Sequence, residues 1–168
     1  MYGRGVLSMV ATAVRQNTIS EVAGYFLNRS LNDFRPNTGV THLKLQKLTY
    51  YAQAWHMVIL GRALFEEKIE AWVHGPVSPE LYNQYRHYGY QIISEIGLRE
   101  YAFEEDTLEV LNAVWKTYGD KDAKDLEKLT HSEEPWQSAR AGMPASMSGN
   151  NEITITSMKD YYSRYYNQ

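Results

Sequence analysis

The sequence predicts a mainly α-helical fold, a compact single-domain helical bundle with minor short β-strand content. Apolar residues recur three and four positions apart in several segments, the spacing that places them on one face of a helix. These segments begin at residues that cap helix N-termini, and several end near glycines that suit C-terminal caps. The 168 residues, 43% hydrophobic and 22% charged, are enough for one domain with a core.

Two helices are predicted in the first third of the chain. Thr18-Ile19-Ser20-Glu21 has the spacing of a capping box, and apolar residues follow it at helical spacing, so the first helix is expected at about 20–30. The second is expected from Thr41, its N-cap, to Gly61, its C-terminal cap. Its buried stripe is expected to comprise Leu45, Leu48, Ala52, Trp55 and Ile59.

Two polar residues of the second helix, Lys47 and His56, fall off that stripe and are expected to face solvent. Two tryptophans are expected to be buried anchors, Trp55 on the stripe and Trp72 in a short extended segment at 69–73.

The centre of the chain is predicted to turn and enter a third helix. His74-Gly75-Pro76-Val77 is expected to be the turn. Ser78 is a typical N-cap, and Pro79 suits the first position of a helix that ends at Gly89. Further helices are expected at about 108–118, 122–129, from Pro135 and from Thr156 or Ser157, with an extended piece near 91–93 and a loop at 141–151.

Charge is distributed unevenly along the chain, although the net charge is only −3. Residues 1–65 carry seven Lys/Arg and two acids, which gives +5, whereas residues 100–134 carry eleven acids and four lysines, which gives −7. The acidic segment is either a solvated helical face or a surface that attracts a basic partner.

Composition and motifs exclude several classes of protein. The absence of cysteine excludes disulfides and thiolate zinc sites and fits a cytoplasmic location. No apolar run approaches the ~20 residues of a membrane helix. No hydrolase, metalloprotease or nucleotide-binding signature is present, so no catalytic residue, metal site or cofactor is predicted.

The predicted helices with the clearest patterns are apolar or acidic, which argues against direct nucleic-acid binding. His131, Glu133 and Glu134 could ligate a metal, but such a grouping is common by chance.

Ordered motifs along residues 20–166 resemble the Panacea domain of SocA-like and phage-associated antitoxins. The matches include 44–48, 50–56, 61–65, 69–72, 75–77, 79–82, 114–119, 129–136 and 152–153. We therefore expect a Panacea-like domain at 17–168 and an N-terminal extension at 1–16. The residues that we assign to its structural motifs are Lys44, Leu45, Gln46, Lys47, Leu48, Trp55, Gly75, Pro76, His131, Pro135 and Trp136.

The resemblance implies an antitoxin that neutralises a cognate protein toxin by direct protein–protein binding. An adaptor that delivers the toxin to a protease is the alternative, and an uncharacterised enzyme is the third. The family brings no established catalytic residues, and the sequence indicates neither the toxin nor the oligomeric state.

Two groups of residues are candidates for binding the partner. Gly75-Pro76 is expected to set the geometry of a surface that contains Trp72, His74, Tyr82, Tyr85 and Arg86, unless the turn is purely structural. The acidic segment supplies the second group, Glu104, Glu105 and Asp106.

Overall fold

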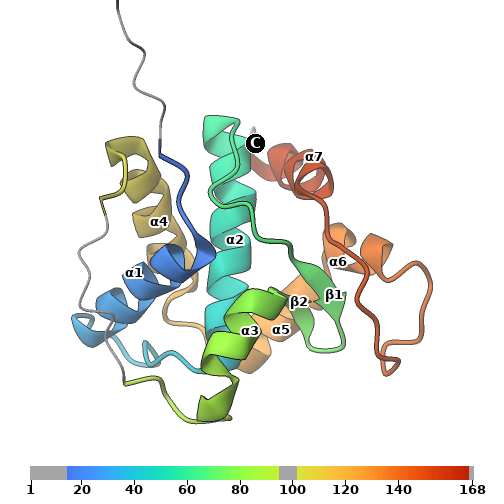
Figure 1. Ribbon diagram of the computed structural model, residues 1–168, viewed down its shortest axis with the longest axis horizontal. Helices are drawn as coiled ribbons and strands as arrows, with labels where there is room; N and C mark the ends of the chain where they lie inside the picture. Colours follow the sequence, from blue (N-terminus) through green and yellow to red (C-terminus); the bar gives the residue numbers. More distant parts are fainter. Residues whose placement is uncertain (1–14, 95–101, 167–168) are drawn as a thin grey trace, which may run out of the picture.

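Helix α2, His42–Leu60, forms the centre of the molecule, and most other elements pack around it (Figure 1). The computed structural model describes residues 15–94 and 102–166. Within these ranges the other elements are α1 Ile19–Leu31, β1 Glu70–Trp72, β2 Gly75–Val77, α3 Pro79–Tyr85, the 3₁₀ turn η1 Arg86–Tyr88, α4 Glu105–Tyr118, α5 Ala123–His131, α6 Glu134–Ala139 and α7 Ile155–Tyr166. The expected mainly α fold with minor strand content is confirmed.

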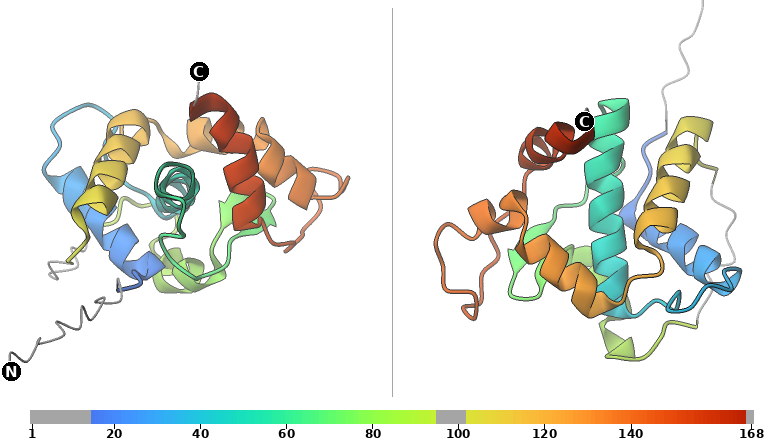
Figure 2. Two further views of the ribbon diagram at one scale, coloured as in Figure 1. Left: turned by 90° about the horizontal axis from the view of Figure 1, so that it is seen from above. Right: turned by 180° about the vertical axis from the view of Figure 1, so that it is seen from behind.

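The views from above and behind show α2 enclosed by its neighbours (Figure 2). It contacts α1, α3, α4, α5, α7 and β2. Its core residues include Leu45, Leu48 and Ala52, as the periodicity predicts. The predicted extension at 1–16 falls almost entirely outside the described residues, as does Glu100.

Helix starts follow the predicted capping chemistry. The side chains of Thr18, Thr41, Ser78 and Asp122 each accept a hydrogen bond from a backbone N–H in the first turn of α1, α2, α3 and α5. Helix α2 ends at Gly61, whose φ of 70° is the left-handed conformation expected of a C-terminal cap.

The polar residues of α2 are buried, so the expectation that Lys47 and His56 face solvent is wrong. His56 contacts the carbonyl of Arg62 through Nδ1 at 2.8 Å and Thr107 Oγ1 through Nε2 at 2.9 Å. Lys47 donates to the carbonyl of Pro76 at 3.2 Å. A helix enclosed on most sides has little solvated face, and its buried polar groups therefore pair with loop backbones.

Two more polar side chains of α2 hold loops in the same way. The ammonium of Lys44 donates to the carbonyls of Asn37, Gly39 and Gly119 at 2.7, 3.2 and 2.7 Å. The amide of Gln53 donates to the carbonyl of Phe65 and accepts from the N–H of Leu64, both at 2.7 Å. The helix thus orders the loops on either side of it in the sequence and, through Gly119, a loop 75 residues away.

The predicted tryptophan anchors are not the most buried tryptophans. Trp55 and Trp72 are each only half-buried, and Ile59 is exposed. Trp55 and Ile59 line a hollow between α2 and α4, and Trp72 lines another hollow beside the hairpin. Trp115 of α4, with 1% of its surface exposed, and Trp136 of α6 are the buried ones. The expectation that Trp55 and Trp72 are buried anchors is therefore wrong in degree.

Residues 70–77 form a hairpin rather than a strand followed by a long turn. Gly75–Val77 is strand β2, paired antiparallel with β1 in the register Trp72↔Gly75 and Glu70↔Val77. The predicted turn at 74–77 is therefore misplaced, and the two residues between the strands make the tight connection. The predicted extended piece near 91–93 forms a bridge between Ile92 and Thr41.

The candidate metal residues are engaged with other groups. The carboxylate of Glu133 accepts hydrogen bonds from the hydroxyls of Tyr51 and Tyr162, while Glu134 pairs with Arg164 at 2.9 Å. Burial raises the pKa of Glu133, although both tyrosine hydroxyls act against that rise. The ring of His131 stacks on Trp136 at 4.0 Å. These side chains join α2, α6 and α7.

Lys47 is expected to make stability depend on pH. Burial lowers its pKa from 10.5 to about 7, so between these values the unfolded chain binds a proton that the folded chain does not. Stability should therefore rise with pH across this window. Lys47→Met should raise the free energy of unfolding by on the order of 2 kcal/mol at neutral pH, a figure that allows for the loss of one hydrogen bond. It should also make the free energy of unfolding depend less steeply on pH.

Urea denaturation at several pH values measures this effect. The pH should stay below about 10, because tyrosines of the unfolded chain begin to ionise there. Lys121 is exposed, so Lys121→Met is the control. It should change neither the free energy of unfolding nor its dependence on pH. A Lys47→Met variant with an unchanged slope would contradict the assignment. Lys44, whose pKa burial lowers to about 8, maintains part of the slope in both proteins.

Candidate functional site

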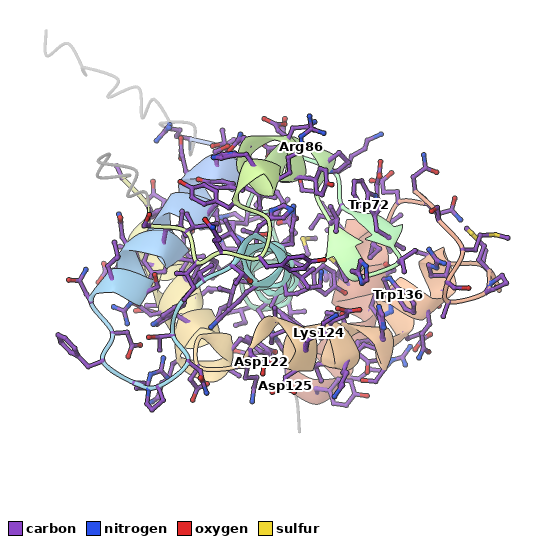
Figure 3. All side chains as sticks on the ribbon, turned by 90° about the horizontal axis from the view of Figure 1, so that it is seen from below. Trp72, Arg86, Asp122, Lys124, Asp125 and Trp136 are labelled. Carbon is purple, nitrogen blue, oxygen red and sulfur yellow. The ribbon has the colours of Figure 1, made fainter. Side chains whose placement is uncertain are left out.

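A groove of about 460 Å³ lies beside the N-terminal end of α2. The first turn of α2, the β1–β2 hairpin, α3 with η1 and the first turn of α5 form its walls. Figure 3 shows this end of the molecule from below, with Arg86, Trp72 and Lys124 on three different elements around α2. We call this hollow the aromatic groove.

The ring of Tyr82 lies between two other rings in the aromatic groove. Its centroid is 5.0 Å from that of Trp72 and 5.1 Å from that of His42. The indole N–H of Trp72 donates to Glu70 at 2.6 Å, and its carbonyl accepts from Trp136 at 2.8 Å. The aromatic lining is therefore held in place before any partner binds.

Helix α2 fixes the hairpin that forms one wall. The side chain of Gln46 accepts from the N–H of Ser78 at 2.9 Å and donates to its carbonyl at 3.2 Å. Lys47 holds the carbonyl of Pro76 from below. Gly75 has a φ of 101° and lies so close to Lys47 that an added Cβ would be 2.7 Å from Cε. Gly75 and Pro76 thus pack directly on α2 at this wall of the groove.

Cationic groups flank the groove. Arg86 is exposed and makes no ion pair within residues 15–94 and 102–166. Lys124, with 71% of its side chain exposed, contacts Glu127 at 3.3 Å, and Glu127 also contacts His74 Nδ1 at 3.0 Å. Burial opposes ionisation of Glu127, yet the hydrogen bonds from His74 and Lys124 prevail and lower its pKa.

Four of the five residues predicted for the first surface meet in this groove. Trp72, His74, Tyr82 and Arg86 line it, whereas Tyr85 does not. Tyr85 is half-buried, packs against the core and lies 6.3 Å from the ring of Tyr88. Tyr85 therefore faces the core and not the groove.

The acidic residues of the second predicted surface lie elsewhere. Glu104, Glu105 and Asp106 line a separate hollow of about 640 Å³ together with Arg62 and Glu109. Both carboxylate oxygens of Asp106 accept from Arg62, at 2.8 and 2.9 Å, and this hydrogen bonding lowers the pKa of Asp106. Arg62 follows the C-terminus of α2, so the two candidate surfaces lie roughly 28 Å apart along this helix of 19 residues.

Among the groove residues that sequence reasoning did not assign to this surface are His42, Tyr90 and Lys124. His42 follows the N-cap of α2, Tyr90 follows Gly89, and Lys124 lies in the first turn of α5. Positions at element ends carry weak periodicity, and only the fold brings these three together. Full exposure of the large Tyr90 ring is the signal that a surface analysis would detect.

The model of the family "Antitoxin SocA-like, Panacea domain" matches residues 45–137, more than half of the chain. The chain belongs to this family. The matched segment contains the hairpin, α3 and the start of α5, so it includes most of the aromatic groove.

A curated relative is similar over part of its length. The chain is 29% identical over 109 residues to "Antitoxin SocA" of Caulobacter vibrioides (strain NA1000 / CB15N). The match covers 58% of each protein, less than two thirds of the relative. No solved structure matches the chain. Among the helices of residues 15–94 and 102–166, none combines the length and apolar character that crossing a membrane requires.

Proposed function

We propose that this protein is a cytoplasmic antitoxin that neutralises a cognate protein toxin by direct binding through the aromatic groove. Membership of the SocA-like antitoxin family supports the antitoxin role. The observation that carries the choice of surface is the groove itself, where Trp72, Tyr82 and Arg86, which pairs with no carboxylate of the described residues, meet in one hollow. Trp, Tyr and Arg are the residues enriched at interface hot spots.

Pre-organisation favours binding at this surface. The groove is built on a hairpin and two helices that are anchored to α2, so binding orders few side chains. We expect the toxin to insert an anchor residue between Trp72 and Tyr82, and Arg86 to contact it at the rim. Neutralisation then follows if the bound antitoxin covers the working surface of the toxin.

Co-expression with the toxin encoded by a neighbouring gene tests the function. Induction of the toxin alone should stop growth, and co-expression of this chain should restore growth and yield a complex that co-purifies. A neighbour that is not toxic, or a toxic one that neither binds this chain nor is relieved by it, would contradict the proposal. Purified chain should also inhibit the toxin in the absence of any protease.

A proteolytic adaptor is the second candidate, and the separation of the two hollows favours it. An adaptor must bind its cargo and a protease at the same time, and surfaces at opposite ends of α2 would permit this. The half-life of the toxin in cells discriminates between the two functions. It should shorten when an adaptor is co-expressed and stay unchanged or lengthen when binding alone neutralises the toxin.

Charge reversal in the acidic hollow is expected to slow association with a basic toxin. Asp106 is paired with Arg62, so the variant should replace only Glu104 and Glu105 by lysine. Long-range attraction chiefly raises association rates and is screened over about 8 Å at physiological salt. The double variant should associate more slowly and show a flatter salt dependence, with little change in the melting temperature.

Stopped-flow association rates across a salt series measure this effect. The control for net charge is the double variant of two exposed acids outside the hollow, Glu152→Lys with Asp160→Lys, which changes the net charge by the same amount. A rate that is equally insensitive to salt and to reversal of Glu104 and Glu105 would show that this segment is only a solvated face.

A further inference from the structure

We propose that the aromatic groove recognises a toxin segment in which a large apolar side chain stands next to a carboxylate side chain. This inference rests on the proposed function and adds the chemistry of the segment that the groove accepts. The apolar group would lie against the rings inside the groove, and the carboxylate would lie at the cationic rim near Arg86.

The inside of the groove suits a large apolar side chain. Trp72, Tyr82 and Val77 contribute ring and aliphatic surface, and Leu43 adds to it from the first turn of α2. The hollow of about 460 Å³ lies within the range of about 300–1,000 Å³ that is typical of ligand pockets. It can therefore hold one or two side chains of a partner, but not a whole helix.

The charge around the groove favours an anion. The N-terminal turns of α2 and α5 both contribute to its lining, so the positive ends of two helices point toward the same region. The first turn of α2 contains no acidic residue, whereas Asp122 at the N-cap and Asp125 in the first turn offset the positive end of α5. Arg86 adds a full positive charge that no described carboxylate neutralises. Arginine binds carboxylates in a planar, two-pronged geometry.

None of the described residues that line the groove is acidic. Glu127 is held by His74 and Lys124, and Asp122 caps α5 by accepting from the N–H of Asp125 at 2.8 Å. In the view of Figure 3, Asp122 and Asp125 lie beyond Lys124 as seen from Arg86. Neither Asp122 nor Asp125 forms an ion pair with Arg86.

His42 provides an unused polar atom in the same lining. Its Nδ1 is buried and has no hydrogen-bond partner in the part of the chain that the structure describes, although its ring packs on Tyr82. Burial is the main cause that lowers the pKa of His42, with Lys47 and His87 adding to the effect, so the ring is neutral at neutral pH. A buried polar atom without a partner is uncommon in folded proteins, and a polar group of the ligand reaches Nδ1 only if the side chains around it move.

Short peptides test this chemistry without the toxin. The probe is acetyl-Gly-Phe-Asp-Gly-amide, compared with the same peptide carrying Asn in place of Asp and with one carrying Ala in place of Phe. Titration into the ¹⁵N-labelled full chain is followed by NMR, using the indole signal of Trp72, which a Trp72→Phe variant assigns. The Phe-Asp peptide should shift this signal and should bind about tenfold more tightly than the Asn peptide.

Arg86→Ala should abolish the preference for Asp over Asn, whereas Arg164→Ala on α7 should preserve it. Equal binding of the Asp and Asn peptides to the wild-type chain, or no shift of the Trp72 indole at millimolar peptide, would overturn the inference. The two proposals fail separately. If the wild-type chain neutralises the toxin but does not prefer the Asp peptide, only the proposed segment chemistry is wrong. If it prefers the Asp peptide but does not neutralise the toxin, only the proposed antitoxin function is wrong.

Discussion

Gly75→Ala is expected to lower the free energy of unfolding by about 2–5 kcal/mol. The backbone of Gly75 has a φ of 101°, which an L-residue with a Cβ rarely adopts. The added carbon would also be 2.7 Å from Lys47 Cε and 2.9 Å from Thr130 Oγ1. Because Lys47 is fully buried, it has little room to yield, and the hairpin that carries Trp72 would have to move.

Gly61→Ala is the matched control for this prediction. Gly61 also has a positive φ, 70°, but a Cβ there would meet no atom within 4 Å. Gly61→Ala should therefore lower the free energy of unfolding only by the cost of backbone strain, about 1–2 kcal/mol. Urea denaturation of both variants measures the difference, and an equal loss in the two would contradict tight packing under the hairpin.

Trp115→Ala is expected to cost about 3–5 kcal/mol, a large part of the stability of a domain of this size. The indole is almost completely buried, donates to Asp33 at 2.8 Å and stacks on Phe26 at a centroid distance of 6.3 Å. The Asp33 carboxylate also binds Arg35, and these hydrogen bonds hold its pKa well below its usual range. Removal of the ring therefore leaves a cavity and disturbs the loop between α1 and α2.

Trp55→Ala provides the comparison. Trp55 is half-buried and donates to the hydroxyl of Tyr118 at 2.9 Å, so its removal leaves a site open to water. Thermal or urea denaturation should show a clearly larger loss for Trp115→Ala than for Trp55→Ala. The reverse order would contradict the burial described here.

Local sequence signals predicted the helix starts well, but they could not predict which polar residues of α2 are buried, because that depends on packing between distant parts of the chain. Thr18, Thr41, Ser78 and Asp122 act within one turn of chain, so their capping role is readable from sequence. The periodicity of α2 implied one buried face and one solvated face. Neighbouring elements cover much of the second face as well, and Lys47 and His56 became buried for that reason.

The residues of the aromatic groove also fall into a group that the sequence predicts and a group that only the fold reveals. Trp72, His74, Tyr82 and Arg86 come from one continuous stretch, and sequence reasoning could place them together because a hairpin and a helix follow each other directly. His42 and Lys124 lie about 30 and 40 residues outside that stretch. Only the packing of α3 and α5 against the start of α2 brings them to the same hollow.

The equilibrium affinity of the purified toxin for groove variants tests the central proposal most directly. Tyr82→Ala and Arg86→Ala should each weaken binding by at least about tenfold, the effect of losing a hot-spot side chain. Tyr165→Ala and Arg164→Ala replace exposed residues of the same types on α7 and should bind like the wild type. Melting curves confirm that all four variants are folded. Unchanged affinity in both groove variants, or a loss confined to the α7 variants, would contradict the assignment of the aromatic groove as the toxin-binding surface.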